Sequence, residues 1–292
     1  MPGHQRDATG PDAGGTGAGG PVEIVGDLDR PGAWMLLTGG VPQSHVDLDD
    51  PLHLEFEYMR WLGHLIGLAA PGGEPLRVLH LGGGGLTLAR YVAATRPGSR
   101  QLAIEAEEEV ARLVRQRLPL ARPRRPRAGT GKITVRVADA RAGLERVPAG
   151  SFDVVVADAF AGGQTPAHLT SVEFTRAVAR VLARPGIYAA NVADGPPLAH
   201  ARGRVAAVRS VFPHVCLIAE AAVLRGRRFG NLVVAAARHE LPVAGLIRRA
   251  AADPFPARVV EGAALDRFVA GSRPITDAHA EPSPVPPPEV FA

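Results

Sequence analysis

The chain has 292 residues, of which 46% are hydrophobic and 21% are charged, and its formal net charge is +4. This composition allows a sizeable core and excludes general disorder, and because no run of about 18 apolar residues is present, no membrane-spanning helix is expected. The single cysteine, Cys216, excludes a disulfide framework and a multi-cysteine metal site. Together with the lack of a membrane span and of a secretory signal, this favours a soluble cytoplasmic protein, and we expect no metal ion.

The N-terminal region differs from the rest of the chain. Residues 1–20 are rich in Gly, Ala, Pro and Asp, and they lack both apolar periodicity and the apolar stretch of a secretory signal, so we expect a disordered tail. Within residues 21–74, the stretch 34–50 has short apolar pieces between turn residues, which predicts a small β-hairpin. Residues 51–69 carry apolar side chains on one helical face, which predicts a helix.

Short apolar runs alternate with helical patterns from residue 75 to residue 240. This alternation predicts an α/β fold with a mostly parallel sheet, and near-continuous apolar runs such as VVVA indicate helices on both faces. The last two runs are joined by about ten residues, which predicts an antiparallel pair. The seven predicted strands are 77–83, 101–106, 133–139, 152–160, 186–193, 215–221 and 231–237, and the predicted helices between them are 86–95, 107–118, 171–183 and 198–212.

Two further segments follow the predicted sheet. Residues 241–271 have two short helical patterns interrupted by DPFP, which predicts a pair of C-terminal helices. Residues 272–292 are rich in proline, and we expect an extended, loosely attached tail.

A glycine-rich loop follows the first strand of the predicted sheet and opens a helix. In LHLGGGG (79–85), Gly82, Gly83 and Gly84 allow the backbone to approach a ligand closely, and the helix N-terminus adds a partial positive charge. A tight turn between strand and helix, without any ligand, is the alternative interpretation of this pattern.

Acidic residues follow the next three predicted strands. Glu105, Asp139 and Asp158 stand at successive strand ends, where ligands of open α/β sheets bind. An acid about 20 residues after a glycine-rich loop is typical of a ribose-binding residue, although Glu105 is also compatible with a solvated carboxylate at the start of a helix. The ordered set predicts an adenosine-containing ligand, while the lack of GxGxxG spacing disfavours dinucleotides.

This order of motifs resembles the spermidine synthases (polyamine aminopropyltransferases), over residues 34–240. The resemblance implies the Rossmann-like fold of S-adenosylmethionine-dependent methyltransferases, with S-adenosylmethionine or its decarboxylated form as co-substrate. Glu105 then corresponds to the ribose-binding acid, and Asp139 with Ala140 to the pair that contacts adenine. GGVPQS (39–44) resembles the segment that covers the substrate, in which Gln43 would contact the sulfonium nucleoside.

The resemblance also implies a catalytic loop after the fourth predicted strand. Asp158 corresponds to the first Asp of the family's Asp-Ser-Ser-Asp-Pro loop, which carries the catalytic base, and Gly162 follows it. Tyr58, after the covering segment, is a candidate substrate contact, as is His168, for which packing or capping is the alternative role. A small-molecule amine or other acceptor is the implied partner. Family members are often dimers or tetramers, so the resemblance also implies an oligomer, for which a homodimer is one candidate.

Two carboxylates of the family pattern are absent. Gly85 stands where the family has the Asp that grips the amino group of the donor, and Ala161 stands where it has the second Asp of the catalytic loop. A dication such as putrescine would therefore form fewer charge-assisted hydrogen bonds, each worth about 1.5–3 kcal/mol. The fold and the nucleoside site carry over, and the polyamine substrate does not.

Three functions remain after the sequence analysis. Aminopropyl transfer to an amine is the first, and methyl transfer to an unknown small acceptor is the second. The third is a non-catalytic nucleoside-binding or scaffold homologue that has lost the polyamine site. The residues 111–129 contain seven arginines but no interleaved aromatics, so a solvated helix end with a basic loop is favoured over a nucleic-acid partner.

Overall fold

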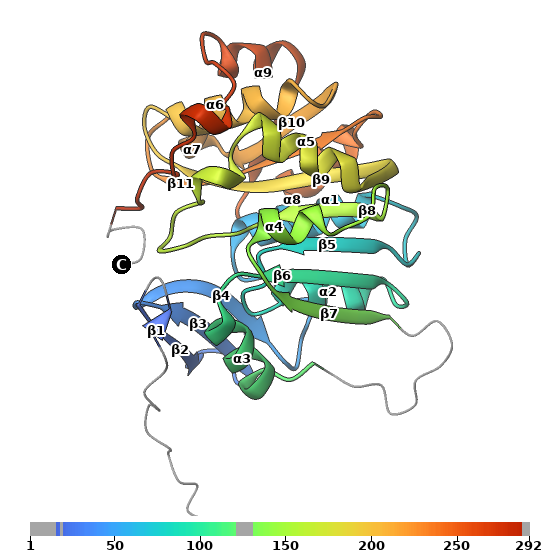
Figure 1. Ribbon diagram of the computed structural model, residues 1–292, viewed down its shortest axis with the longest axis vertical. Helices are drawn as coiled ribbons and strands as arrows, with labels where there is room; N and C mark the ends of the chain where they lie inside the picture. The colour runs from blue at the N-terminus through green and yellow to red at the C-terminus, as the bar shows by residue number, and fades with distance from the viewer. Residues whose placement is uncertain (1–15, 18–19, 121–130, 288–292) are drawn as a thin grey trace, which may run out of the picture.

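Two β-sheets organise the chain, a small N-terminal sheet and a large central one (Figure 1). The structure is a computed structural model that describes residues 16–17, 20–120 and 131–287. Three predicted segments lie wholly or largely outside the described ranges: the tail at 1–20, the basic loop within 111–129 and the last five residues. Among the described residues, no helix is both long and apolar enough to cross a lipid bilayer.

The N-terminal sheet is antiparallel and contains the predicted hairpin. Its strands are β1 (Thr16–Gly17), β2 (Gly20–Gly26), β3 (Ala33–Thr38) and β4 (Val41–Asp47), in this spatial order. Gly39 and Gly40 form the turn between β3 and β4, and both have positive φ angles, as two-residue hairpin loops of this hand require. The expectation of a disordered tail is wrong for Thr16, Gly17 and Gly20, because backbone pairing in β1 and β2 needs no apolar side chains.

The large sheet positions the candidate site. The spatial order of its strands is β12-β10-β11-β9-β8-β5-β6-β7; the five strands from β9 to β7 are parallel to one another, and β11, β10 and β12 join antiparallel. The α/β, mostly parallel fold and the antiparallel pairing of β10 with β11 are thus confirmed. The strands are β5 (Arg77–Leu81), β6 (Arg100–Glu105), β7 (Lys132–Val137), β8 (Phe152–Ala157), β9 (Leu182–Asp194), β10 (His214–Glu220), β11 (Gly230–Ala237) and β12 (Ala257–Val260).

The sheet has eight strands rather than the seven expected. The additional strand, β12, lies between the two C-terminal helices and pairs antiparallel with β10. It is only four residues long, and its neighbours have helical periodicity, so no strand pattern stands out in the sequence. Its register, Leu217 with Val260 and Ile218 with Val259, covers the edge of β10.

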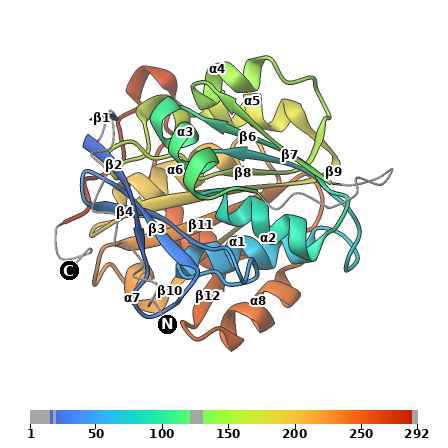
Figure 2. The same cartoon turned by 90° about the horizontal axis from the view of Figure 1, so that it is seen from below.

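Helices cover both faces of the large sheet, as predicted (Figure 2). Alternating strand residues face opposite layers: in β8, Val155 belongs to one core cluster, and Val154 and Val156 belong to the other. The helices α1, α2 and α8 pack on the second cluster, and α4, α5, α6 and α9 pack on the first. The described helices are α1 (Glu57–Leu68), α2 (Thr87–Thr95), α3 (Glu108–Arg117), α4 (Ala140–Glu145), α5 (Val172–Val181), α6 (Ala199–Arg209), α7 (Ala221–Leu224), α8 (Val243–Ala252) and α9 (Gly262–Val269).

The C-terminal segment is not loosely attached, contrary to the expectation for residues 272–292. In Figure 1 it runs from α9 down the left side of the molecule toward the N-terminal sheet. Ser283 is fully buried; its hydroxyl oxygen accepts the Thr165 N–H at 2.8 Å, and its own N–H donates to the Thr165 carbonyl at 3.1 Å. Arg141 forms a two-bond ion pair with Asp277. Extended segments rich in proline can dock through such backbone and charged contacts without any apolar pattern.

We expect Ser283→Ala to destabilise the protein by about 1–3 kcal/mol, because it removes the buried hydroxyl that accepts the N–H of the half-buried Thr165. Chemical denaturation monitored by circular dichroism measures this difference. Ser272→Ala, a half-buried serine of the same segment, is the control and should change stability by less than about 0.5 kcal/mol. Equal stabilities of the two variants would show that the Ser283 contact contributes nothing.

Candidate functional site

The glycine-rich loop connects β5 to α2 and passes against the end of β8. Gly82 has a φ of +98°, and a Cβ atom at this position would collide with the carbonyl oxygen of Asp158. Only glycine fits here, because both the backbone conformation and the approach of β8 exclude a side chain. The absence of a side chain at Gly82 therefore allows the loop to lie directly against the backbone of Asp158.

The carboxylate of Glu105 fixes the other side of this loop. One of its oxygens accepts the N–H groups of Gly83 and Gly84, at 2.8 and 2.9 Å, and its second oxygen accepts the Glu107 N–H at 2.9 Å. Hydrogen bonds to a charged acceptor are stronger than neutral ones. Glu105 thus connects the end of β6, the loop and the start of α3, and it lies at the strand end that the sequence predicted.

Strand β4 closes the loop from the side of the N-terminal sheet. The Ser44 hydroxyl oxygen accepts the Gly85 N–H at 3.0 Å, and the Thr87 hydroxyl donates to the His45 carbonyl at 2.7 Å. A Cβ atom on Gly85 would lie 2.5 Å from a methyl group of Val46 and 3.1 Å from the Ser44 Cβ. The position that corresponds to the missing family Asp therefore has no space for a side chain while β4 is in place.

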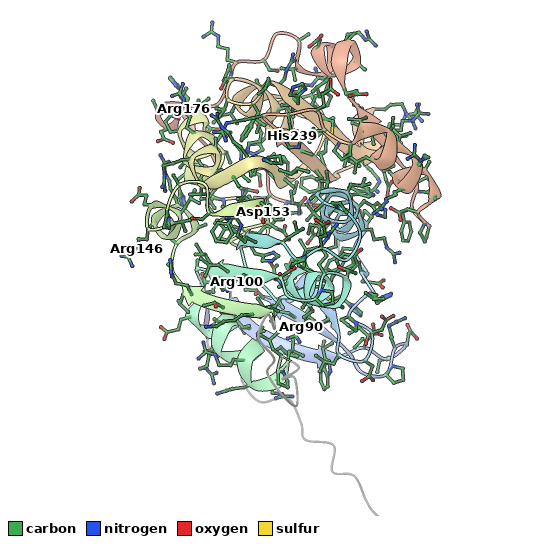
Figure 3. All side chains as sticks on the ribbon, turned by 90° about the vertical axis from the view of Figure 1, so that its right-hand side faces the viewer. Arg90, Arg100, Arg146, Asp153, Arg176 and His239 are labelled. Carbon is green, nitrogen blue, oxygen red and sulfur yellow. The ribbon has the colours of Figure 1, made fainter. Side chains whose placement is uncertain are left out.

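A buried arginine holds the carbonyl side of the loop. Arg90, labelled in Figure 3, extends from α2 and donates to the carbonyls of Gly85, Leu118 and Pro119. Burial lowers the pKa of its guanidinium to about 10, so the group stays charged at neutral pH. The loop and the end of α3 consequently share one cation.

Asp158 stands at the end of β8, with two side chains bound to it. Asn191 of β9 donates its amide to one carboxylate oxygen at 2.9 Å, and the Tyr58 hydroxyl of α1 donates a second hydrogen bond. Burial raises the pKa of Asp158 to about 6, although both hydrogen bonds act in the opposite direction. Burial and the adjacent Asp158 raise the pKa of Tyr58 well above its ordinary value, so the phenol remains a donor.

A solvent-open cavity lies between the loop, β4 and Asp158. Three carboxylates line it, those of Glu105, Glu107 and Asp158, and among the described residues no lysine or arginine does so. His80 also lines the cavity; burial lowers its pKa to about 4, so its imidazole is neutral at physiological pH. The lining is therefore acidic and suits a cationic ligand.

Most of the site residues predicted from the sequence line this cavity. Those that the structure brings together are Gln43, Tyr58, Gly82, Gly83, Gly84, Glu105, Asp158 and Gly162. Gln43 extends from β4, where its amide nitrogen donates to the Val41 carbonyl at 3.3 Å.

Three predicted residues lie outside the cavity lining, namely Asp139, Ala140 and His168. The Asp139 carboxylate caps α4 by accepting the N–H groups of Arg141 and Ala142, each at 2.9 Å, and it also binds the His168 ring at 2.6 Å. His168 thus faces Asp139 rather than a substrate next to Asp158. An adenine contact of Asp139 and Ala140 stays a prediction, because the structure uses the Asp139 side chain as a helix cap.

The sequence analysis gave no role to Asn191 or Ser44, although both shape the site. Asn191 is 5% exposed in a strand where every neighbour from Ile187 to Ala193 except Tyr188 is purely aliphatic. An isolated amide in such an apolar run was the available signal. Ser44 lies directly after Gln43 but bonds the loop backbone, and only the three-dimensional pairing of β4 with the loop reveals this role.

Comparison with known proteins identifies related sequences. The model of the spermine/spermidine synthase domain matches residues 55–216, more than half of the chain. A polyamine aminopropyltransferase of Chromobacterium violaceum is 29% identical over 149 residues, covering 51% of this chain and 53% of the relative. Polyamine aminopropyltransferase 2 of Streptomyces coelicolor is 33% identical over 156 residues, covering 52% of this chain and 28% of the relative. The matched part thus spans about half of the first relative and little more than a quarter of the second.

Solved structures show the same relationship. A probable spermidine synthase from Corynebacterium glutamicum superposes with a TM-score of 0.78 and 34% identity, covering 87% of this chain and 92% of that one. A spermidine synthase from Thermotoga maritima has a TM-score of 0.56 at 17% identity, covering 85% of this chain and 80% of that one, and it supports the fold alone.

We expect Glu105→Gln to lower the free energy of unfolding by about 1–3 kcal/mol even without ligand. Both carboxylate oxygens of Glu105 accept backbone N–H groups, and the glutamine amide replaces one of these acceptors with an NH₂ donor. Denaturation of the ligand-free protein measures this change. The exposed Glu108→Gln in the first turn of α3 is the matched control, since it loses only an interaction of about 0.3–1 kcal/mol with the helix dipole. If Glu105→Gln were as stable as Glu108→Gln, the hydrogen bonds of Glu105 would not contribute to stability.

Proposed function

Because the chain belongs to the spermine/spermidine synthase family, we propose that it transfers an aminopropyl group from decarboxylated S-adenosylmethionine to an amine. The observation that carries the proposal is Asp158, a carboxylate with a pKa of about 6 that Asn191 and Tyr58 hold in an acidic cavity. A base in this pKa range is ionised at neutral pH and able to take a proton.

The proposed reaction is an in-line displacement at carbon. The acceptor nitrogen forms a bond to the aminopropyl carbon next to the sulfonium, the carbon–sulfur bond breaks, and its electron pair leaves with sulfur as the neutral thioether methylthioadenosine. The proton released by the acceptor nitrogen passes to the Asp158 carboxylate. The sulfonium already activates the carbon, so the protein contributes mainly alignment and proton removal.

The electrostatics of the cavity support cationic reactants. Glu105, Glu107 and Asp158 face the same space, and a sulfonium or an ammonium bound there would be attracted by all three. The ribose would bind at Glu105, and Gln43 with the glycine loop would cover the rest of the nucleoside. These assignments rest on the position of the residues around the cavity.

We further propose that the acceptor carries less positive charge than a diamine such as putrescine. Ala161 lines the cavity without the carboxylate that the family pattern has there, and Val46 fills the space next to Gly85. The carboxylate missing at Ala161 removes a charge-assisted hydrogen bond from the second ammonium group of a diamine. A monoamine needs only the single carboxylate of Asp158.

The packing of Val46 against Gly85 also supports a second candidate, methyl transfer from S-adenosylmethionine to a small acceptor. Without a carboxylate at position 85, the amino group of the decarboxylated donor loses its family partner, and the preference for that donor weakens. A purely non-catalytic role is disfavoured, because burying the Asp158 carboxylate is energetically unfavourable and a scaffold protein would not require it.

The nucleoside product distinguishes these functions. We would incubate the purified protein with either donor and with putrescine or butylamine, and identify the products by mass spectrometry. Methylthioadenosine and an aminopropylated amine support the proposal, whereas S-adenosylhomocysteine supports methyl transfer. Faster turnover of putrescine than of butylamine would contradict the proposed acceptor, and no product with either donor would contradict both enzymatic candidates.

We expect Asp158→Asn to reduce turnover by about 10²–10⁴-fold, as loss of a general base does, while nucleoside affinity stays close to wild type. Turnover of wild type should fall as the pH decreases through about 6, because the carboxylate must be ionised to accept a proton. Rates of methylthioadenosine formation from about pH 5 to about pH 8 measure this profile.

Asp153→Asn is the matched control for Asp158. Asp153, labelled in Figure 3, belongs to the same strand but pairs with Arg77 outside the cavity. Its replacement should leave the pH profile unchanged. Stability provides a second check: burial raises the folded pKa of Asp158 above its ordinary 3.8, so wild-type stability should decrease as pH rises from about 4 to about 6, and Asp158→Asn should weaken this dependence. A turnover profile that Asp158→Asn leaves intact would exclude the base role.

We expect Gly85→Asp alone to destabilise the protein by about 1–3 kcal/mol, because its side chain meets Val46, and Val46→Ala to restore part of that loss. A double-mutant cycle of thermal or chemical unfolding measures this coupling. When Ala161→Asp is added, putrescine affinity should increase by about 1.5–3 kcal/mol for each ammonium contact formed. Additive stabilities of Gly85→Asp and Val46→Ala would show that β4 does not restrict position 85.

A further inference from the structure

Two histidines and a glutamate meet outside the cavity, where β4 leads toward α1. His45 belongs to β4, and His53 and Glu55 lie in the segment between β4 and α1. Each offers one potential ligand atom, and these atoms all lie within 4.8 Å of one another. The rings of the two histidines meet edge to face at 5.5 Å between centroids. None of the three residues lines the cavity next to Asp158.

One nitrogen of the His45 ring is buried and has no partner. His45 is 2% exposed, its Nε2 binds the Asp27 carboxylate at 2.8 Å, and its Nδ1 has no hydrogen-bond partner among the described residues. A buried, unpaired ring nitrogen costs free energy unless something binds it. A histidine whose other nitrogen donates to a carboxylate is the usual arrangement of a metal ligand, because the carboxylate fixes the ring and its tautomer.

We propose that His45, through Nδ1, His53 and Glu55 bind a divalent transition metal ion of the Zn²⁺ type. Two imidazoles and one carboxylate are ligands that zinc prefers, and three protein ligands leave one tetrahedral position for water. Asp27 orients His45 without binding the ion. The expectation of a protein without metal, drawn from the single cysteine, took no account of these histidines.

The neighbouring contacts are compatible with an ion. The His53 Nε2 and the Glu55 carboxylate form a hydrogen bond of 2.8 Å, and a metal ion would replace the proton between the two side chains. Their side chains are 18% and 49% exposed, so an ion can reach them from solvent. The nearby Arg30 is neutralised by Asp47 and Asp50, with which it forms ion pairs.

A metal ion here would fasten the N-terminal sheet to the segment that enters α1. The carbonyl of His45 accepts the Thr87 hydroxyl, and the adjacent Ser44 holds the Gly85 N–H, so β4 supports the glycine loop. Helix α1 carries Tyr58, which binds Asp158. The ion would therefore stiffen two walls of the cavity without touching the reactants.

Zinc binding to the full chain, purified without a polyhistidine tag, tests the proposal. We expect one zinc ion per chain by inductively coupled plasma mass spectrometry after gel filtration, and a rise of the melting temperature on zinc addition. In competition with a chromophoric chelator, His53→Ala and Glu55→Gln should each weaken zinc binding at least tenfold, and Asp27→Asn should weaken it by about 10–100-fold. His53 and Glu55 are partly exposed, so their variants should fold.

His64→Gln is the matched control. His64 of α1 also pairs with a carboxylate, that of Asp253 at 2.9 Å, but it belongs to no three-ligand group among the described residues. Its replacement should leave zinc affinity unchanged. Zinc affinity that His53→Ala and Glu55→Gln leave at the wild-type value, or a melting temperature that zinc does not raise, would overturn the proposal.

Discussion

One carboxylate oxygen of Glu105 accepts the N–H groups of both Gly83 and Gly84, and this contact fixes the glycine-rich loop around which the rest of the site is arranged. The loop has no side chains of its own with which to pack, so charged anchors must hold it: Glu105 on its N–H groups and Arg90 on the Gly85 carbonyl. Once it is held, α2 starts in a defined place and β4 can dock against it.

The same docking limits what the cavity can bind. Val46 of β4 lies so close to the backbone of Gly85 that no side chain fits at position 85. The carboxylates among the described lining residues are those of Glu105, Glu107 and Asp158. Under the proposed function, this one packing contact would be enough to change which reactants the cavity accepts.

Strand ends were predictable from the sequence because β-α alternation and apolar runs mark them, and Glu105 and Asp158 could be placed for that reason. Asp139 shows the limit of this reasoning: it also follows a strand, but its carboxylate caps α4, and local capping competes with ligand binding for the same oxygens. Strand β12 was missed because four residues between helices carry too short a pattern. An isolated amide in an apolar run marks Asn191 in the sequence. Its contact with Asp158 and the grouping of His45, His53 and Glu55 depend on how the elements pack, which no spacing along the chain reveals.

The docking of the C-terminal segment has a consequence for exchanging parts between relatives. The loop after Asp158 contacts residues more than a hundred positions further along: Gln164 and Thr165 bind Ser283, and a Cβ atom added to Gly163 would lie 3.4 Å from the Pro286 ring. A chimera that transplants only this loop would lack the C-terminal segment that contacts it. The loop and the C-terminal segment must therefore come from the same parent, because recombination between them would separate the loop after Asp158 from the segment that it contacts.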